Sequence, residues 1–366
     1  MNNDVSIAGS RLINISDRRL SPLSKLVVKS PDCQPAIWKF SDVLAVPGKT
    51  GLYDCTGFRI DESTWKFQTN QALLSESVKL KIARALEKGN PANVDVSALL
   101  RKYGKFDQND ETVLFLGGIN CHYGHWLIDF TSRLWAANLP QSPASRFMLP
   151  APWAFRERTP YEVSYMTPFF DWAHLNCEQV NGIDRPTIFR EVVIPEPSLQ
   201  NIQVIFSAAD TSHIGVADSI KFDREAYHGK KIYLSRKKVI SDIKKVVGED
   251  IVEIYFARLG FDIIYPEELS FIDQISLFNS AEIIAGFAGS AFHTGMLSTP
   301  LFKGTLLIIC GDEMINTRFV LQGAIKSYST ILLRGYDWIN RTCDGELPIM
   351  RANIDLLKSG LRIIGL

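Results

Sequence analysis

The C-terminal half of the chain alternates short apolar runs with amphipathic stretches. Apolar runs that predict buried strands lie at 231–235, 261–266, 282–286, 305–310 and 330–335. Stretches with helical periodicity lie between them, at about 249–259, 270–279, 290–297 and 315–326. Continuously apolar strands that alternate with helices are typical of a parallel, doubly wound sheet. This half is therefore predicted to be Rossmann-like.

The N-terminal half gives its clearest pattern after residue 112. A short apolar strand, 113–118, closes on two glycines, a helical run follows over about 122–137, and a second strand covers 146–149. This order predicts a β-α-β unit. Earlier in the chain, short β-rich runs are followed by a polar stretch, 75–89, that predicts a helix.

A strand-like run at 190–197 leads into a linker that we expect near 197–215. Two α/β halves of this kind predict an N-terminal domain over 1–205 and a C-terminal domain over 206–340. Ligands would then bind outside the carboxyl ends of the strands, in a cleft between the domains. The remaining segment, 341–366, is predicted to be helical and to pack back on the first domain. The alternative is a peripheral membrane anchor, for which its two basic helix residues give thin support.

Length and charge narrow the class of protein. A chain of 366 residues favours two domains and can bury a large core without a disulfide or metal. Equal numbers of basic and acidic residues, 40 each, remove the broad attraction that nucleic-acid and anionic-membrane binders use. No apolar stretch approaches the roughly 18 residues of a membrane span, and the first residues lack a secretory pattern. We therefore expect a cytoplasmic protein without a nucleic-acid partner.

The cysteines also favour a reducing compartment. They lie far apart and form no CxxC pair, which is typical of reduced, mostly buried thiols. They are Cys33, Cys55, Cys121, Cys177, Cys310 and Cys343.

Polar side chains gather on one face of the helix predicted over 122–137. At about 100° per residue the following side chains share a stripe: His122, His125, Trp126, Asp129 and Arg133. Asn120 precedes them as the predicted N-cap. A histidine and an aspartate four residues later can hydrogen-bond, and the carboxylate then orients the imidazole for general-base work. Trp126 offers a ring face on which a sugar could stack.

Two other interpretations of this stripe stay open. Asp129 and Arg133 can form a surface ion pair while the histidines only satisfy the helix start. His122, His125 and Asp129 could instead ligate a metal, but the HExxH pattern is absent and no Glu separates the two histidines. We expect no metal site.

A second set of residues predicts an anion site. Small residues at 289–291 form a turn after a strand, and the first N–H groups of the helix that follows can bind an anion. Ser235 and Arg236 end another strand, where an arginine fork can grip phosphate. Small residues also permit tight helix-on-sheet packing, which is the competing interpretation.

Other nucleotide and hydrolase patterns are missing from the sequence. Neither GxGxxG nor a Walker A motif occurs. A nucleophile elbow at Ser290 would need glycines two residues before and after it, where Ala288 and Phe292 stand. The only histidine after Ser290 is His293, which lies too close in sequence for the hydrolase order.

Three motifs, taken in order over residues 120–302, resemble those of glycosyltransferase family 61. They are NCHYGHWLIDFTSRLW, KIYLSRK and LGFDIIYPEELSFIDQISLFNSAEIIAGFAGSAFHTGMLSTPLF. The resemblance implies an α/β, GT-B-like fold with two Rossmann-like domains facing each other across a cleft. It also implies a nucleotide-sugar donor, a glycan acceptor, and inverting transfer that requires no metal or other cofactor. The sequence agrees in lacking the Asp-x-Asp element of metal-dependent glycosyltransferases.

The resemblance assigns roles to both sets of residues. His125 would be the base, Asp129 its partner, and His122 the alternative base or an acceptor contact. The predicted acceptor-side residues are Asn120 and Trp126. The predicted donor-side residues are Ser235, Arg236, Glu268, Gln274, Gly289, Ser290, Ala291 and His293. Domain 1–205 would then bind the acceptor and domain 206–340 the donor.

The chain departs from the family pattern at two places. Ala288 stands where the family often has a histidine, and Gly248-Glu249 stands where Asn-Glu is expected. The main alternative is therefore a non-catalytic homologue that binds a carbohydrate or nucleotide. For an active enzyme, the resemblance suggests the assembly of a bacterial surface polysaccharide, such as capsule or O-antigen.

Overall fold

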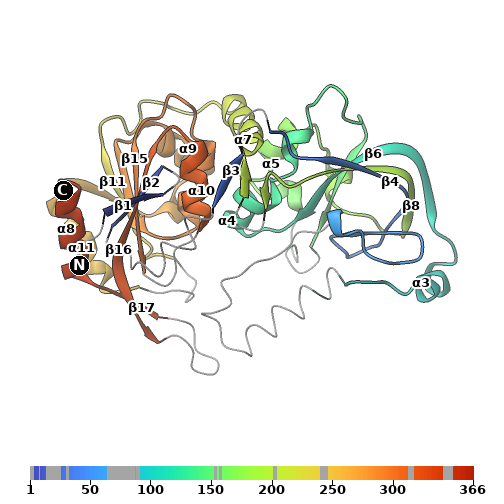
Figure 1. Cartoon of the computed structure of the whole chain (residues 1–366), viewed down its shortest axis with the longest axis horizontal. Helices are drawn as coiled ribbons and strands as arrows, with labels where there is room; N and C mark the ends of the chain where they lie inside the picture. The colour runs from blue at the N-terminus through green and yellow to red at the C-terminus, as the bar shows by residue number, and fades with distance from the viewer. Residues whose placement is uncertain are drawn as a thin grey trace.

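The structure is a computed structural model that describes most of the chain (Figure 1). The described residues are 4–7, 9–13, 26–29, 33–63, 87, 91–151, 155, 159–200, 204–239, 246–311, 317–340 and 349–366. Apart from residue 87, the helix predicted at 75–89 lies outside the described residues, and so does Cys343.

The larger sheet is built mainly from the C-terminal half. Its strands run in the order β1-β2-β16-β15-β14-β11-β13, and every neighbouring pair from β2 to β13 is parallel. The prediction of a parallel sheet in this half is confirmed. Its strands are β1 (Asp4–Ile7), β2 (Ser10–Ile13), β11 (Lys231–Leu234), β12 (Val246–Val247), β13 (Phe261–Ile264), β14 (Ile283–Phe287), β15 (Thr305–Gly311), β16 (Ser329–Asn340) and β17 (Ile349–Ala352).

Helices cover both faces of this sheet. Leu306 and Ile308 of β15 face α9, η7 and α10, whereas Leu307 and Ile309 face α8 and α11. Burial on both faces explains why the strands are apolar throughout. The helices are α8 (Glu249–Arg258), α9 (Phe271–Ser280), the 3₁₀ helix η7 (Ser290–Leu297), α10 (Thr317–Ile325) and α11 (Ile354–Ile363), with a short 3₁₀ turn η6 (Pro266–Glu268) before α9.

The smaller sheet belongs to the N-terminal half and has the order β5-β4-β8-β6-β7. β6 is parallel to β7 and β8, which confirms the predicted β-α-β unit, while β4 is antiparallel to β5 and β8. The sheet is therefore mixed. Its strands are β4 (Ile37–Ala45), β5 (Leu52–Tyr53), β6 (Asp107–Ile119), β7 (Arg146–Pro150) and β8 (Thr187–Pro195).

Short helical elements surround this smaller sheet. They are η1 (Asp61–Ser63), α3 (Val96–Tyr103), α4 (Tyr123–His125), the π-turn η3 (Trp126–Phe130), η4 (Leu134–Ala136), η5 (Pro160–Glu162), α5 (Thr167–Trp172) and α6 (Cys177–Val180).

The prediction of a linker near 197–215 is wrong. This stretch holds β9 (Leu199–Gln200) and β10 (Val204–Phe206), which pair in a small sheet with β3 (Val27–Lys29), and the start of helix α7 (Ala208–Ser219). Small residues such as alanine, serine and glycine dominate α7, so its buried face gives a weak apolar periodicity in the sequence.

Both ends of the chain join the larger sheet (Figure 1). β2 pairs in parallel with β16, so residues 4–13 lie outside the half to which the sequence assigned them. β17 pairs with β16, and α11 packs on the same sheet through Leu357 and Leu361. The C-terminal segment thus buries its apolar face on its own half. The expectation that it packs back on the first domain is wrong.

One hydrophobic cluster joins the two halves. Leu116, Trp126 and Met148 share it with Phe271 of α9 and Leu297 of η7. The segment after β6 is therefore fixed against the helices of the larger sheet. The described helices include none that is long and apolar enough to cross a membrane. The described cysteines form no disulfide with one another.

Candidate active site

The candidate site begins where β6 ends. The Asn120 side chain accepts a hydrogen bond from the His122 N–H at 2.9 Å, which turns the chain out of the sheet. His122, and not Asn120 as predicted, is the N-cap of α4, because its Nδ1 accepts from the His125 N–H at 3.4 Å. The His122 ring is exposed and its centroid lies 4.5 Å from that of His125.

The predicted continuous helix over 122–137 is interrupted by a π-turn. The Trp126 N–H bonds the His122 carbonyl as in an α-helix, but the Thr131 N–H reaches back five residues to the Trp126 carbonyl at 3.2 Å. π-Turns of this kind are rare and often mark functional sites. The extra residue in the turn alters which side chains share a face.

Asp129 lies at the centre of the site. Its carboxylate is 2.6 Å from His125 Nδ1 and accepts two hydrogen bonds from Arg318, from Nε and Nη2, each at 3.1 Å. Arg318 comes from α10 in the C-terminal half, and the sequence analysis missed it. No local motif marks this arginine, because its partner stands 189 positions earlier in the chain.

The charges of this cluster favour an ionised Asp129. Burial alone would raise the pKa of its carboxyl group, but the hydrogen bond with His125 and the charge of Arg318 hold the pKa below its ordinary value. An ionised Asp129 accepts from Nδ1–H of His125. In the neutral tautomer of His125 that makes this bond, Nε2 carries the lone pair. The His125 side chain is 28 % exposed, which leaves it within reach of a ligand.

Two members of the predicted stripe do not face a ligand. Trp126 is fully buried and packs edge-on against Phe169 and Phe170, so it cannot stack on a sugar as expected. Arg133 is also buried and donates to the carbonyls of Pro195 and Glu62. The ion pair considered between Asp129 and Arg133 is therefore absent among the hydrogen bonds and ion pairs described for these two side chains.

The glycine turn of the second set lies directly against α4. A Cβ added to Gly124 would lie 2.9 Å from His293 Cδ2 and 3.0 Å from Ser290 Oγ. Gly289, Ser290 and Ala291 are only partly buried. They stand at the start of η7, where the first backbone N–H groups of a helix have no acceptor within the helix itself. The two predicted sets of residues are thus brought together.

His293 is a buried member of this contact. Its ring stacks on Phe319 with centroids 4.7 Å apart, and Nδ1 lies 3.2 Å from Gln322 Oε1. Burial lowers the pKa of His293 to about 3, and the positive charge of Arg318 adds to this effect. A neutral His293 packs beside the turn and brings no positive charge to a nucleotide-sugar.

Arg236 lies on the other side of the turn. Its Nη1 donates to the Ala288 carbonyl at 3.0 Å, and a Cβ at Gly289 would lie 3.6 Å from the same nitrogen. Glu249 accepts the Arg236 backbone N–H at 2.8 Å, which fixes the loop after β11. Ser235 is fully buried and donates to Glu253 at 2.6 Å. Contrary to the prediction, its side chain is not available to a ligand.

The two remaining donor-side candidates have structural partners. Glu268 pairs with Lys238 at 2.7 Å, with both side chains about half exposed. Gln274 donates to the Pro266 carbonyl and accepts from the Tyr123 hydroxyl at 3.1 Å. Tyr123 also bonds Thr294 Oγ1 at 2.7 Å. Gln274 therefore ties α4 to the larger sheet's helices, a role that the sequence did not predict.

No metal centre is found within the described ranges of the chain. No group of three or more His, Cys, Asp or Glu side chains there is arranged to hold a metal ion, so His122, His125 and Asp129 do not form such a set.

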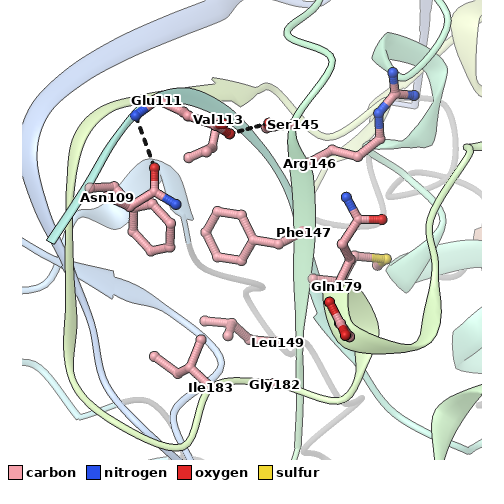
Figure 2. A pocket seen from close by; sticks show the side chains of 13 residues that line it. Asn109, Glu111, Val113, Ser145, Arg146, Phe147, Leu149, Gln179, Gly182 and Ile183 are labelled. Atoms are coloured by element: carbon pink, nitrogen blue, oxygen red, sulfur yellow. Dashed lines mark hydrogen bonds between the residues drawn. The ribbon is translucent and has the colours of Figure 1, made fainter. Parts of the chain in front are cut away.

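Two surface cavities lie elsewhere, along the edge strand β7. They have volumes of about 220 and 320 Å³ and share Leu149, Gly182 and Ile183. Figure 2 shows Phe147 and Leu149 of β7 pointing into the first of them, opposite Asn109. The described residues that line the two cavities include none from α4 or η7. The candidate site is therefore defined by its side chains and not by these two cavities.

The family model Glycosyltransferase 61 matches residues 123–304, the stretch that holds α4, the loop after β11 and the glycine turn. The chain belongs to this family and is a glycosyltransferase, as the motifs predicted. No curated protein matches the chain.

Proposed function

We propose that this glycosyltransferase moves a sugar, with inversion and without a metal, from a nucleotide-sugar to a glycan acceptor. The observation that carries the proposal is the meeting of His125, Asp129 and Arg318 with the turn at 289–291, through the contact of Gly124 with Ser290. It brings a general base next to an anion site, and an inverting transfer needs both.

The proposed reaction starts with the acceptor hydroxyl. His125 Nε2 takes its proton, and Asp129 stabilises the imidazolium that forms. The acceptor oxygen attacks the anomeric carbon from the face opposite the leaving group. The bond from that carbon to the phosphate oxygen breaks, and its electron pair leaves with the nucleoside diphosphate. His122, exposed beside His125, contacts the acceptor in this proposal, with Asn120 shaping the approach.

The leaving diphosphate needs positive charge and N–H donors. Arg236 and the backbone of Gly289, Ser290 and Ala291 supply them in this proposal. Among the described residues, only the Ala288 carbonyl accepts from the Arg236 guanidinium, which leaves donors for a phosphate. We further propose a GT-B-like division, with acceptor binding by the smaller sheet's half and donor binding by the larger sheet's half.

The proposed setting is the cytoplasmic face of a bacterial membrane, in surface-polysaccharide assembly. This rests on the family resemblance of the three motifs over residues 120–302.

A second candidate is a homologue that binds a nucleotide or carbohydrate without turnover. Ala288 favours it, and so do the structural partners that occupy Ser235, Glu268 and Gln274. The intact pair of His125 with Asp129 favours the enzyme.

A screen of common sugar nucleotides tests the proposal. We expect one of them to raise the melting temperature by mass action and to release free nucleotide, slowly alone and faster with a glycan acceptor. Pretreatment with EDTA should leave the rate unchanged. Binding without any nucleotide release would favour the second candidate, and activity that Mg²⁺ or Zn²⁺ restores after EDTA would overturn the metal-free reaction.

A further inference from the structure

The π-turn frees one buried carbonyl group next to the candidate base. In a regular α-helix the Leu127 carbonyl would accept from the N–H of Thr131. Here that N–H bonds Trp126, and the next one, from Ser132, bonds the Asp129 carbonyl at 3.4 Å. Leu127 is fully buried, so its carbonyl needs another donor.

His213 of α7 lies against this carbonyl. Its Nε2 is 2.6 Å from the Leu127 oxygen, and its Nδ1 is 2.7 Å from the Ala209 oxygen. The Thr131 hydroxyl donates to the same Leu127 oxygen at 3.1 Å. His213 is 2 % exposed, and no step of the proposed reaction uses it. Burial lowers the pKa of its ring, and a neutral imidazole has one N–H, so it donates to only one of these two carbonyl oxygens. The tautomer with its proton on Nε2 donates to Leu127.

α7 is itself held in place by α10, the helix that supplies Arg318. Lys326, directly after α10, is buried, forms an ion pair with the partly buried Asp210 of α7, and donates to the Ser298 carbonyl at 2.8 Å. The two ends of α10 thus act on one turn. Arg318 holds the side chain of Asp129, and Lys326 holds the helix whose His213 meets the backbone of Leu127.

We propose that His213 is a positioning residue, whose imidazole satisfies the carbonyl that the π-turn frees and so fixes Asp129 relative to His125. The proposal rests on the proposed function for its effect on turnover, but not for its effect on the turn. Without His213 the buried Leu127 carbonyl keeps only the Thr131 hydroxyl as a donor. In this proposal the turn then gains stability by rewinding to a regular helix, which moves Asp129 away from its position between His125 and Arg318.

The experiment compares three variants of the full chain. His213→Leu removes the imidazole donor and leaves the Thr131 hydroxyl in place. His213→Gln keeps an N–H near the position of Nε2, and His228→Leu alters an exposed histidine as a control. Hydrogen exchange of the peptide over 126–132 reports on the turn. Nucleotide release from the active sugar nucleotide gives kcat, and titration with the matching nucleoside diphosphate gives its Kd.

For His213→Leu we expect exchange over 126–132 that is about 10- to 100-fold faster and kcat about 100-fold lower, with Kd within about threefold of wild type. His213→Gln should recover most of both losses, and His228→Leu should match wild type. Wild-type exchange in His213→Leu, or a His213→Gln variant as impaired as His213→Leu, would overturn the proposal.

Two further arms keep the test decisive. If His213→Leu does not fold, His213→Asn replaces it, because its shorter amide does not reach Leu127. If the wild type releases no nucleotide from any sugar nucleotide, the proposed function fails, and the exchange rates alone decide whether His213 holds the π-turn.

Discussion

Asp129 shows how much one residue depends on partners that lie far from it in the sequence. Its bond to His125 follows from the spacing of four residues, and the sequence predicted it. Its bonds to Arg318 depend on how α10 packs against the smaller half, and no spacing rule reports that. Trp126 was misplaced for a related reason, since a tryptophan beside two histidines fits a sugar platform as well as a core position.

The pH dependence of stability tests the placement of His293. Burial lowers its pKa to about 3, whereas an unfolded imidazole titrates near 6.5. The unfolded state therefore binds the proton more readily, and the stability from His293 is complete above about pH 6.5 and falls as pH drops toward 3. At pH 5 the loss is about 2 kcal/mol. Urea unfolding at pH 7 and pH 5 measures how much unfolding free energy each protein loses on acidification. We expect His293→Phe to lose about 2 kcal/mol less than wild type, because the variant lacks the titrating ring. An equal loss in both proteins would contradict the buried, neutral ring.

At the scale of elements, regular strands were easier to predict than irregular helices. β11, β13, β14, β15 and β16 lie within a few residues of the predicted runs, because strands buried on both faces must be apolar throughout. The segment after β6 was predicted as one helix, yet it divides into α4, η3 and η4. A helical periodicity of 3.6 residues cannot show where a backbone hydrogen bond spans five residues in place of four. Helix α7 was missed because its buried face is made of small residues.

The contact between α4 and η7 gives a prediction with a diagnostic sign. Replacing a helical glycine by alanine ordinarily stabilises a protein by about 0.5 to 1 kcal/mol. At Gly124 the added methyl group would meet His293 and Ser290 at about 3 Å, so Gly124→Ala should instead destabilise by about 1 to 3 kcal/mol. Chemical denaturation measures this change. A more stable variant would mean that α4 and η7 do not lie in close contact.

At the scale of the whole molecule, the two halves are less separate than the sequence suggested. β1 and β2 cross into the larger sheet, α11 stays with it, and one core cluster joins the halves around Trp126. Arg318 and Tyr123 add polar links across the same boundary. The motifs of the family were sufficient to predict the class of enzyme, but these long-range contacts decide which residues of the motifs reach a ligand.

The central claim is that a base from one half acts beside an anion site from the other, and the most direct test separates turnover from binding in two variants. His125→Ala should lower kcat at least about 100-fold while the Kd of the nucleoside diphosphate stays within about threefold, because a general base acts only in the chemical step. Arg236→Ala should weaken nucleotide binding by about 2 to 3 kcal/mol, because a charged hydrogen-bond donor is lost. A His125→Ala variant with wild-type kcat, or an Arg236→Ala variant with wild-type Kd, would contradict this account.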